Sequence, residues 1–140
     1  GFFTLNAARS TAAPVSQGEK APVIVCSPAG GTLLLITSAV IGSGDDALGG
    51  RLMQNFLGTL PEMGESLWRI VLLNGGVTLA TQTSPALPAL QKLEAAGVGI
   101  FVCGTCLEHF KLTQEKAVGQ VTNMLDVVTG LQLAGKVIHL

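Results

Sequence analysis

The chain alternates short, continuous apolar runs with segments in which apolar side chains recur at helical spacing. The run at 33–37 lies between glycines, the run at 68–73 ends at Asn74-Gly75-Gly76, and the run at 98–102 follows Gly97. Such runs are typical of buried strands in a parallel sheet. Between them, a leucine-rich segment begins at Asp45-Asp46 and stops at Pro61. A second begins at Ser84-Pro85, which we expect to cap it, and runs to Gly97. Both segments predict amphipathic helices.

The last third of the chain continues the same order of strand and helix. The strand at 98–102 leads directly into Cys103, where we expect a turn of helix. A last helix is expected at residues 121–134, and Gly135 then precedes a closing strand at 136–140. The repeated order predicts an α/β fold with a mostly parallel sheet of about five strands. Such sheets place reactive groups at the carboxyl ends of their strands, where Cys103 stands.

Residues 1–31 have a different composition from the rest of the chain. They are rich in Ala, Ser, Thr, Pro and Gly, with one short apolar patch at 23–26 that leaves room for one added strand. They lack the basic start, long apolar stretch and cleavage signature of a signal peptide. We therefore expect a leader or linker over 1–31, a folded domain over 32–140, and a cytoplasmic protein.

The composition narrows the classes of function. Only 12% of the 140 residues are charged against 48% apolar residues, so we expect some apolar surface to be buried between subunits. The net charge of -1, the scattered Lys and Arg, and an aromatic content of 4% argue against nucleic acid as a partner. No apolar run approaches the roughly 20 residues of a membrane span.

The segment Cys103-Gly104-Thr105-Cys106 carries the strongest chemical signal in the sequence. Two thiols three residues apart at the start of a helical turn are expected to lie on one face, near unpaired backbone N–H groups, and such a setting favours thiolate. The spacing permits both redox chemistry and sulfur transfer. A purely structural alternative is that two small side chains pack in a tight turn.

Other candidate residues have weaker support. His109 is a second-rank candidate to stabilise a thiolate or donate a proton. A zinc site would have to combine the cysteine pair with Cys26, His109 or His139, without a second metal-type pair, so no metal is expected. The segment Gly42-Ser43-Gly44 matches no phosphate-binding motif, and the two aspartates after it would repel an anion, so no nucleotide or other cofactor is expected.

Four separated segments together resemble the YedF-like family of sulfurtransferase-like proteins associated with selenium metabolism. They are Gly42-Ser43-Gly44-Asp45-Asp46-Ala47-Leu48-Gly49, Leu73-Asn74-Gly75-Gly76-Val77, Cys103-Gly104-Thr105-Cys106-Leu107 and Val121-Thr122-Asn123-Met124. The resemblance extends from about residue 33 to residue 140. It places the chain in the group of DsrE, DsrF and TusD-like proteins, which implies a three-layer flavodoxin-like fold, trimers or hexamers, and a carrier cysteine after the third strand. By position that carrier is Cys103.

The resemblance also bears on the second cysteine and on the leader. Cys106 matches the second cysteine of the YedF-like branch, to which we assign resolving or sulfur-sharing duty. Complete family members usually carry an upstream TusA-like domain with a Cys-Pro motif. Residues 1–31 are too short to contain this domain, and Cys26-Ser27-Pro28 does not have the Cys-Pro order of its motif. We therefore interpret the leader as a remnant of the TusA-like domain, or that domain as a separate partner protein.

The sequence therefore predicts a sulfur relay protein that accepts sulfane sulfur, and possibly selenium in its place, as a persulfide on Cys103 and passes it to an acceptor protein. Two other hypotheses remain open. One is a non-catalytic subunit that supplies a binding surface to a sulfur-relay assembly. The other is a redox switch in which Cys103 and Cys106 form a disulfide reversibly.

Overall fold

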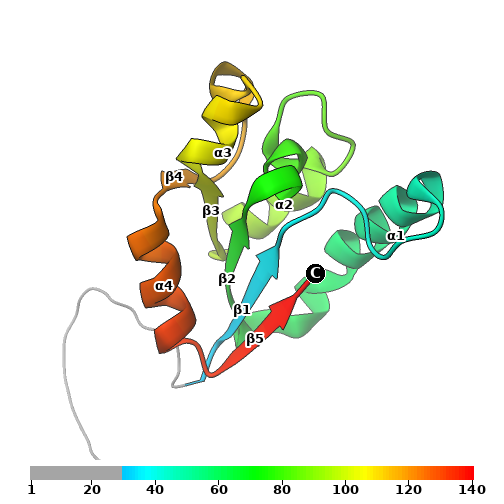
Figure 1. Cartoon of the computed structure of the whole chain (residues 1–140). Helices are drawn as coiled ribbons and strands as arrows, with labels where there is room; N and C mark the ends of the chain where they lie inside the picture. The colour runs from blue at the N-terminus through cyan, green and yellow to red at the C-terminus, as the bar shows by residue number, and fades with distance from the viewer. Residues whose placement is uncertain (1–29) are drawn as a thin grey trace, which may run out of the picture.

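The fold is a five-stranded, fully parallel sheet between two helical layers (Figure 1). The computed structural model describes residues 30–140, so Cys26 and the added strand expected at 23–26 lie outside the described residues. In chain order the strands are β1 Thr32–Ile36, β2 Leu67–Leu72, β3 Gly99–Cys103, β4 Gln120–Thr122 and β5 Lys136–His139. Their order in the sheet is β4-β3-β2-β1-β5. The predicted three-layer α/β fold with a parallel sheet of about five strands is confirmed.

The helices are divided unequally between the two sides of the sheet (Figure 1). On one side lie α1 (Asp46–Thr59) and α2 (Leu87–Ala95), and on the other lies α4 (Met124–Leu133). The short α3 (Gly104–His109) stands at the carboxyl end of β3. The 3-10 segments η1 (Leu60–Ser66), η2 (Asn74–Ala80) and η3 (Thr113–Glu115) complete the connections. No helix in this part of the chain is long and apolar enough to cross a membrane.

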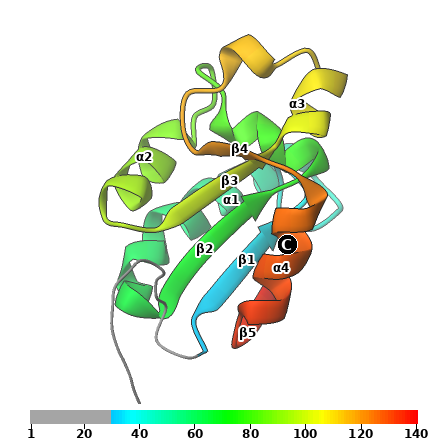
Figure 2. The ribbon, with the colours of Figure 1, turned by 90° about the vertical axis from the view of Figure 1, so that its left-hand side faces the viewer.

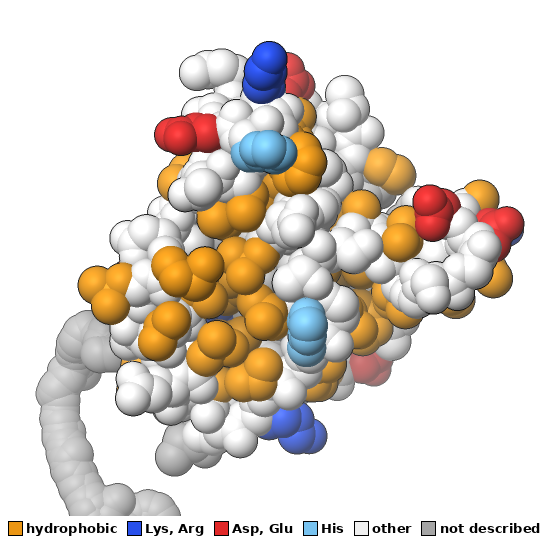
Figure 3. Space-filling view, viewed as in Figure 1, with side chains coloured by type: hydrophobic (Ala, Val, Ile, Leu, Met, Phe, Trp, Pro, Cys, Tyr) orange, Lys and Arg blue, Asp and Glu red, His pale blue; other side chains and the backbone are white. Residues whose placement is uncertain are grey.

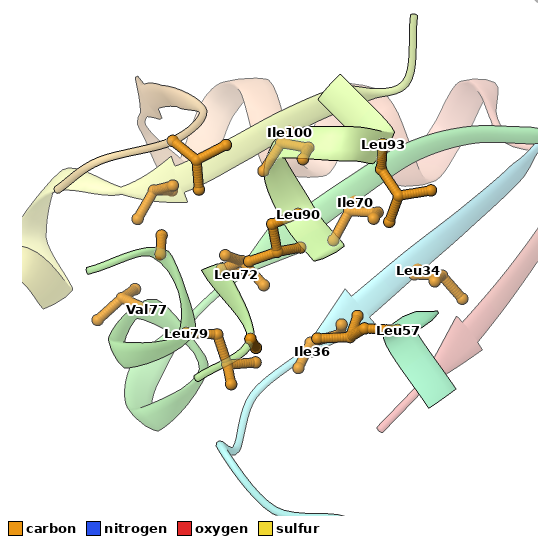
Figure 4. Packing of buried hydrophobic residues seen from close by; sticks show 14 of the residues in the cluster. Leu34, Ile36, Leu57, Ile70, Leu72, Val77, Leu79, Leu90, Leu93 and Ile100 are labelled. Carbon is orange, nitrogen blue, oxygen red and sulfur yellow. The ribbon is translucent and has the colours of Figure 1, made fainter. Parts of the chain in front are cut away.

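The main core lies between the sheet and the layer of α1 and α2 (Figure 4). Alternate residues of the three central strands point into it, as the two-residue period of a strand requires: Leu34, Ile36, Ile70, Leu72, Ile100 and Val102. All are at most 2% exposed, and each contributes about 2 kcal/mol from the burial of apolar surface. A smaller cluster on the other side joins Leu33 and Val71 to Val127 of α4.

Two predicted element starts need correction. The segment expected to open the last helix is instead the three-residue strand β4, and α4 begins at Met124. Asn123 sets this start, since its side-chain oxygen accepts a hydrogen bond from the N–H of Asp126. Ser84 does not cap α2, because its hydroxyl accepts from the N–H of Ala86, just before the helix begins. Asp45 does cap α1, by accepting from the N–H of Leu48.

Candidate functional site

Cys103 is the last residue of β3 and the N-cap of α3. Its backbone is extended, and its Sγ accepts a hydrogen bond from the N–H of Cys106 at 3.4 Å, so the cysteine caps α3. The side chain is 7% exposed. Gly104 follows because a Cβ there would lie 2.9 Å from the Cγ1 of Val121 on the adjacent strand β4. The sequence thus folds into a strand end that holds one sulfur against a backbone amide.

Cys106 is the more exposed of the two cysteines and has a partner of its own. The backbone N–H of Asn74 donates a hydrogen bond to its Sγ at 3.1 Å. Asn74 follows the end of β2 after one intervening residue, so the carboxyl ends of β2 and β3 both contribute to the site. The two sulfurs therefore each accept one backbone N–H: Cys103 from the first turn of α3, and Cys106 from the segment that follows β2.

The segment Leu73 to Gly76 is shaped to present the Asn74 amide. Asn74 has a φ of 49°, in the left-handed region that asparagine tolerates better than most residues. The N–H of Gly76 bonds the carbonyl oxygen of Leu73 at 2.8 Å. A Cβ at Gly76 would overlap the carbonyl oxygen of Ile36, so glycine is what allows this segment to pack directly on the end of β1.

The electrostatics distinguish the two thiols. Burial raises the pKa of Cys106, and its hydrogen bond and charge interaction with Cys103 raise it further, while the Asn74 amide acts in the opposite direction. The expectation that both thiols favour thiolate is therefore wrong for Cys106, because desolvation outweighs the backbone donor. Near neutral pH Cys106 is a thiol that can donate its proton toward Cys103.

An open cavity of about 380 Å³ gives access to both cysteines. It is lined by Leu73, Asn74, Cys103, Thr105, Cys106, His109, Phe110 and Met124. The His109 ring stands edge-on to Phe110, with centroids 5.2 Å apart, and within residues 30–140 it makes no hydrogen bond to either sulfur. A larger hollow of about 450 Å³ lies at the opposite end of the strands, but it is lined by neither cysteine nor histidine.

Four of the predicted site residues, Cys103, Thr105, Cys106 and His109, line the one cavity of about 380 Å³. Gly104 lies outside its lining, against β4. His139 instead lies on β5, where its Nε2 is 3.2 Å from the hydroxyl of Thr37. In the described part of the chain, no three His, Cys, Asp or Glu side chains gather as a metal site would require. The sequence interpretation gave no role to Asn74 or Met124. For Asn74, the sequence did offer a signal: the Asn-Gly-Gly segment that follows a buried strand.

The raised pKa of Cys106 leads to a prediction for the Cys103→Ser variant. Two of the causes that raise this pKa come from Cys103, so we expect the pKa of Cys106 to fall in the variant. Cys106 should then react with iodoacetamide at a lower pH than in the wild-type protein. The measurement is the alkylation rate of Cys106 against pH, followed by peptide mass spectrometry. An unchanged or higher midpoint would contradict the coupling between the two thiols.

The fold and site define a small α/β protein with a pair of cysteines at the carboxyl edge of a parallel sheet. The chain belongs to the DsrE/DsrF-like family, whose model matches residues 38–140. That membership indicates a role in sulfur relay in general terms. A search of curated proteins gave no match.

Two solved structures share the fold. The YchN protein from E. coli superposes with a TM-score of 0.64 at 17% identity, covering 79% of this chain and 99% of that one. MTH1491 from Methanobacterium thermoautotrophicum, titled a protein of unknown function, gives a TM-score of 0.61 at 16% identity with the same coverage. At these identities the similarity establishes the fold alone.

Proposed function

We propose that this protein relays sulfane sulfur, with Cys103 as the carrier. The observation that supports this most directly is the position of the Cys103 sulfur. It caps α3 through the Cys106 amide and borders a cavity shared with a second thiol. A backbone donor at the sulfur stabilises negative charge there, whether on a thiolate or on a persulfide. The YedF-like resemblance adds selenium as a second cargo for the same site.

The transfer steps need no oxidant or reductant beyond the sulfur donor. The Cys103 thiolate attacks the outer sulfur of a donor persulfide, a new S–S bond forms, and the donor leaves as a thiolate. The persulfide on Cys103 then gives its outer sulfur to an acceptor thiolate, and Cys103 is released as a thiolate. Cys106 lies where it can share the sulfur or hold the proton, and His109 borders the same cavity as a proton donor to the leaving thiolate.

A sulfur-loading experiment tests this proposal. The wild-type protein is incubated with glutathione persulfide, freed of excess donor and weighed intact by mass spectrometry. We expect the mass to rise by one sulfur atom and to return to its first value after cyanide removes the sulfur as thiocyanate. Absence of a cyanide-sensitive adduct would contradict the carrier function.

The proximity of the two thiols, through which Cys103 raises the pKa of Cys106, supports a second candidate function, the dithiol redox switch. In that case the cysteines would cycle between dithiol and disulfide without carrying a sulfur. Equilibration against glutathione buffers of stepwise potential, followed by alkylation, separates the two functions. A switch would show a single two-electron midpoint within the cytosolic range, whereas a carrier need not.

The outer face of α4 supports the expectation of a homo-oligomer, and also the alternative of a binding subunit. Figure 3 shows apolar side chains gathered over α4 and the neighbouring β5. The most exposed are Met124, Leu125, Val128, Leu133 and Val137, at 43–74%. A contiguous apolar patch of this kind marks an interaction surface. We propose that it is buried between subunits of a trimer or hexamer, and that donor and acceptor proteins, among them a TusA-like one, approach from the cavity side in the cytoplasm.

A charge placed on this face is expected to dissociate the oligomer. Leu125 is 74% exposed, so Leu125→Glu should leave the fold of one protomer intact while placing a carboxylate in the subunit contact. Analytical ultracentrifugation should then show a shift from oligomer to monomer, and Gln91→Glu on α2 serves as the control with the same added charge. A wild-type protein that is already monomeric would contradict this proposal.

A further inference from the structure

Arg69 has an unusual setting in the layer between the sheet and α4. It lies on β2, and its guanidinium carbon is 4.4 Å from the ring centroid of Trp68 and 4.4 Å from that of Phe101. Its Nη1 also occupies the space beside Gly130 of α4, where a Cβ would be 3.0 Å away. Two aromatic rings and a helix backbone therefore hold the guanidinium in one place, which lowers the entropy cost of any further contact.

The positive charge of Arg69 has no direct counter-ion among residues 30–140. Within that range its guanidinium makes neither a salt bridge nor a hydrogen bond, and Asp126 acts on it only as a charge at longer range. The Asp126 carboxylate instead accepts a hydrogen bond from the Thr122 hydroxyl at 3.2 Å. Burial lowers the pKa of Arg69, which reflects the loss of water around the cation. The five N–H donors of the guanidinium thus lack hydrogen-bond acceptors among residues 30–140.

The side of the sheet that carries Arg69 is only partly covered by helix. Figure 2 faces this side and shows α4 in front of β1 and β5, with no helix in front of most of β2 and β3. Trp68, Arg69 and Phe101 are each partly exposed there. Tryptophan and arginine are the residue types most enriched where a partner protein binds tightly. The combination of an open sheet face, two rings and an unpaired cation is that of a docking surface.

We propose that Trp68, Arg69 and Phe101 form a docking site for a partner protein segment that presents an acidic side chain flanked by apolar ones. The carboxylate would form the fork-like pair with the guanidinium, and the apolar neighbours would cover the two rings. Charge complementarity selects this occupant. A second copy docked face to face about a twofold axis would instead bring two Arg69 cations together.

The docking site and the carrier cysteine lie along the same strand. Arg69 is the register partner of Gly99, and Cys103 follows four residues later at the end of β3. At about 3.3 Å per residue the acidic contact lies roughly 13 Å along the strand from Cys103. A partner held there reaches the cysteine cavity with a neighbouring loop. The docking itself does not depend on sulfur transfer.

Trp68 is the only tryptophan of the chain, so its fluorescence reports on this site. The full chain is titrated with the blocked peptide Ac-Leu-Asp-Leu-Ala-NH2 and with the matched peptide containing Asn in place of Asp. The same titrations are made on Arg69→Met, and on Lys92→Met as a control that removes one positive charge from α2. Melting curves of both variants verify that they are folded.

We expect a saturable change in Trp68 fluorescence with the Asp peptide. Binding should be at least about tenfold weaker for the Asn peptide and for Arg69→Met, and unchanged for Lys92→Met. Equal responses to both peptides, a response that survives Arg69→Met, or no response would overturn the proposal. So would a Trp68 signal that changes on simple dilution of the protein, since a second copy would then cover the site. Cys103→Ser should bind as wild type, which separates this result from the carrier function.

Discussion

Cys103→Ser is expected to abolish the capture of sulfane sulfur while leaving the protein folded. The substitution replaces a buried sulfur with an oxygen that still accepts the N–H of Cys106, so the start of α3 should survive. A serine hydroxyl cannot form a persulfide under the loading conditions. The adduct in the intact mass should therefore fall to the background of a protein that was never exposed to donor.

Two variants with a different cysteine replaced provide the controls. Cys106→Ser should keep the adduct, because its role in the proposal is to share the sulfur or hold the proton. Cys26→Ser should load as wild type, since Cys26 has no assigned role. The carrier assignment fails if Cys103→Ser still takes up one sulfur, or if loading is lost only with Cys106→Ser.

Among substitutions that add a single methyl group near the site, Gly76→Ala is expected to cause the largest loss of stability. The new Cβ would overlap the carbonyl oxygen of Ile36, and backbone cannot rotate away as a flexible side chain can. Moving η2 off β1 should cost about 3 kcal/mol in the free energy of unfolding, at the upper end for overpacking. It should also displace the Asn74 amide from Cys106, which the alkylation rate of Cys106 would report.

Gly50→Ala is the matched control for this substitution. Gly50 lies inside α1, and a Cβ there would meet no heavy atom within 4 Å. Alanine should therefore raise the free energy of unfolding by up to about 1 kcal/mol through its higher helix propensity. Urea denaturation of the two variants beside the wild type gives both values. A Gly76→Ala protein as stable as wild type would show that η2 does not pack on β1 as described.

The strands and helices that carry long apolar patterns were predictable from the sequence. The run at β1 is continuous because both faces of that strand are covered by apolar contacts. The acidic cap and the leucines of α1 mark the start and the buried face of that helix. Strand β4 was not predictable, since three residues are too few to show a period and two of them are exposed. In the sequence, its apolar Val121 fits the helical pattern of the segment that follows it.

Only those residues of the candidate site that are close to one another in the sequence could be predicted. Cys103, Cys106 and His109 fall on one strand end and one short helix, so their spacing alone brings them together. The Asn74 amide comes from the end of another strand, and its role depends on how closely η2 packs on β1. The raised pKa of Cys106 depends on burial and on the proximity of Cys103, and neither can be read from a local pattern. The setting of Arg69 between two rings is likewise a product of the sheet register.

The central claim is that the relayed sulfur is carried by Cys103, and fragment-ion mass spectrometry of the loaded wild-type protein tests it most directly. Trypsin leaves both cysteines on the peptide that ends at Lys111, because no Lys or Arg lies between Leu93 and Phe110. After rapid alkylation of the persulfide, fragments that break between Cys103 and Cys106 locate the extra sulfur. We predict that it is found first on Cys103 at short loading times. An extra sulfur that is found at the earliest times only on Cys106 would contradict the account.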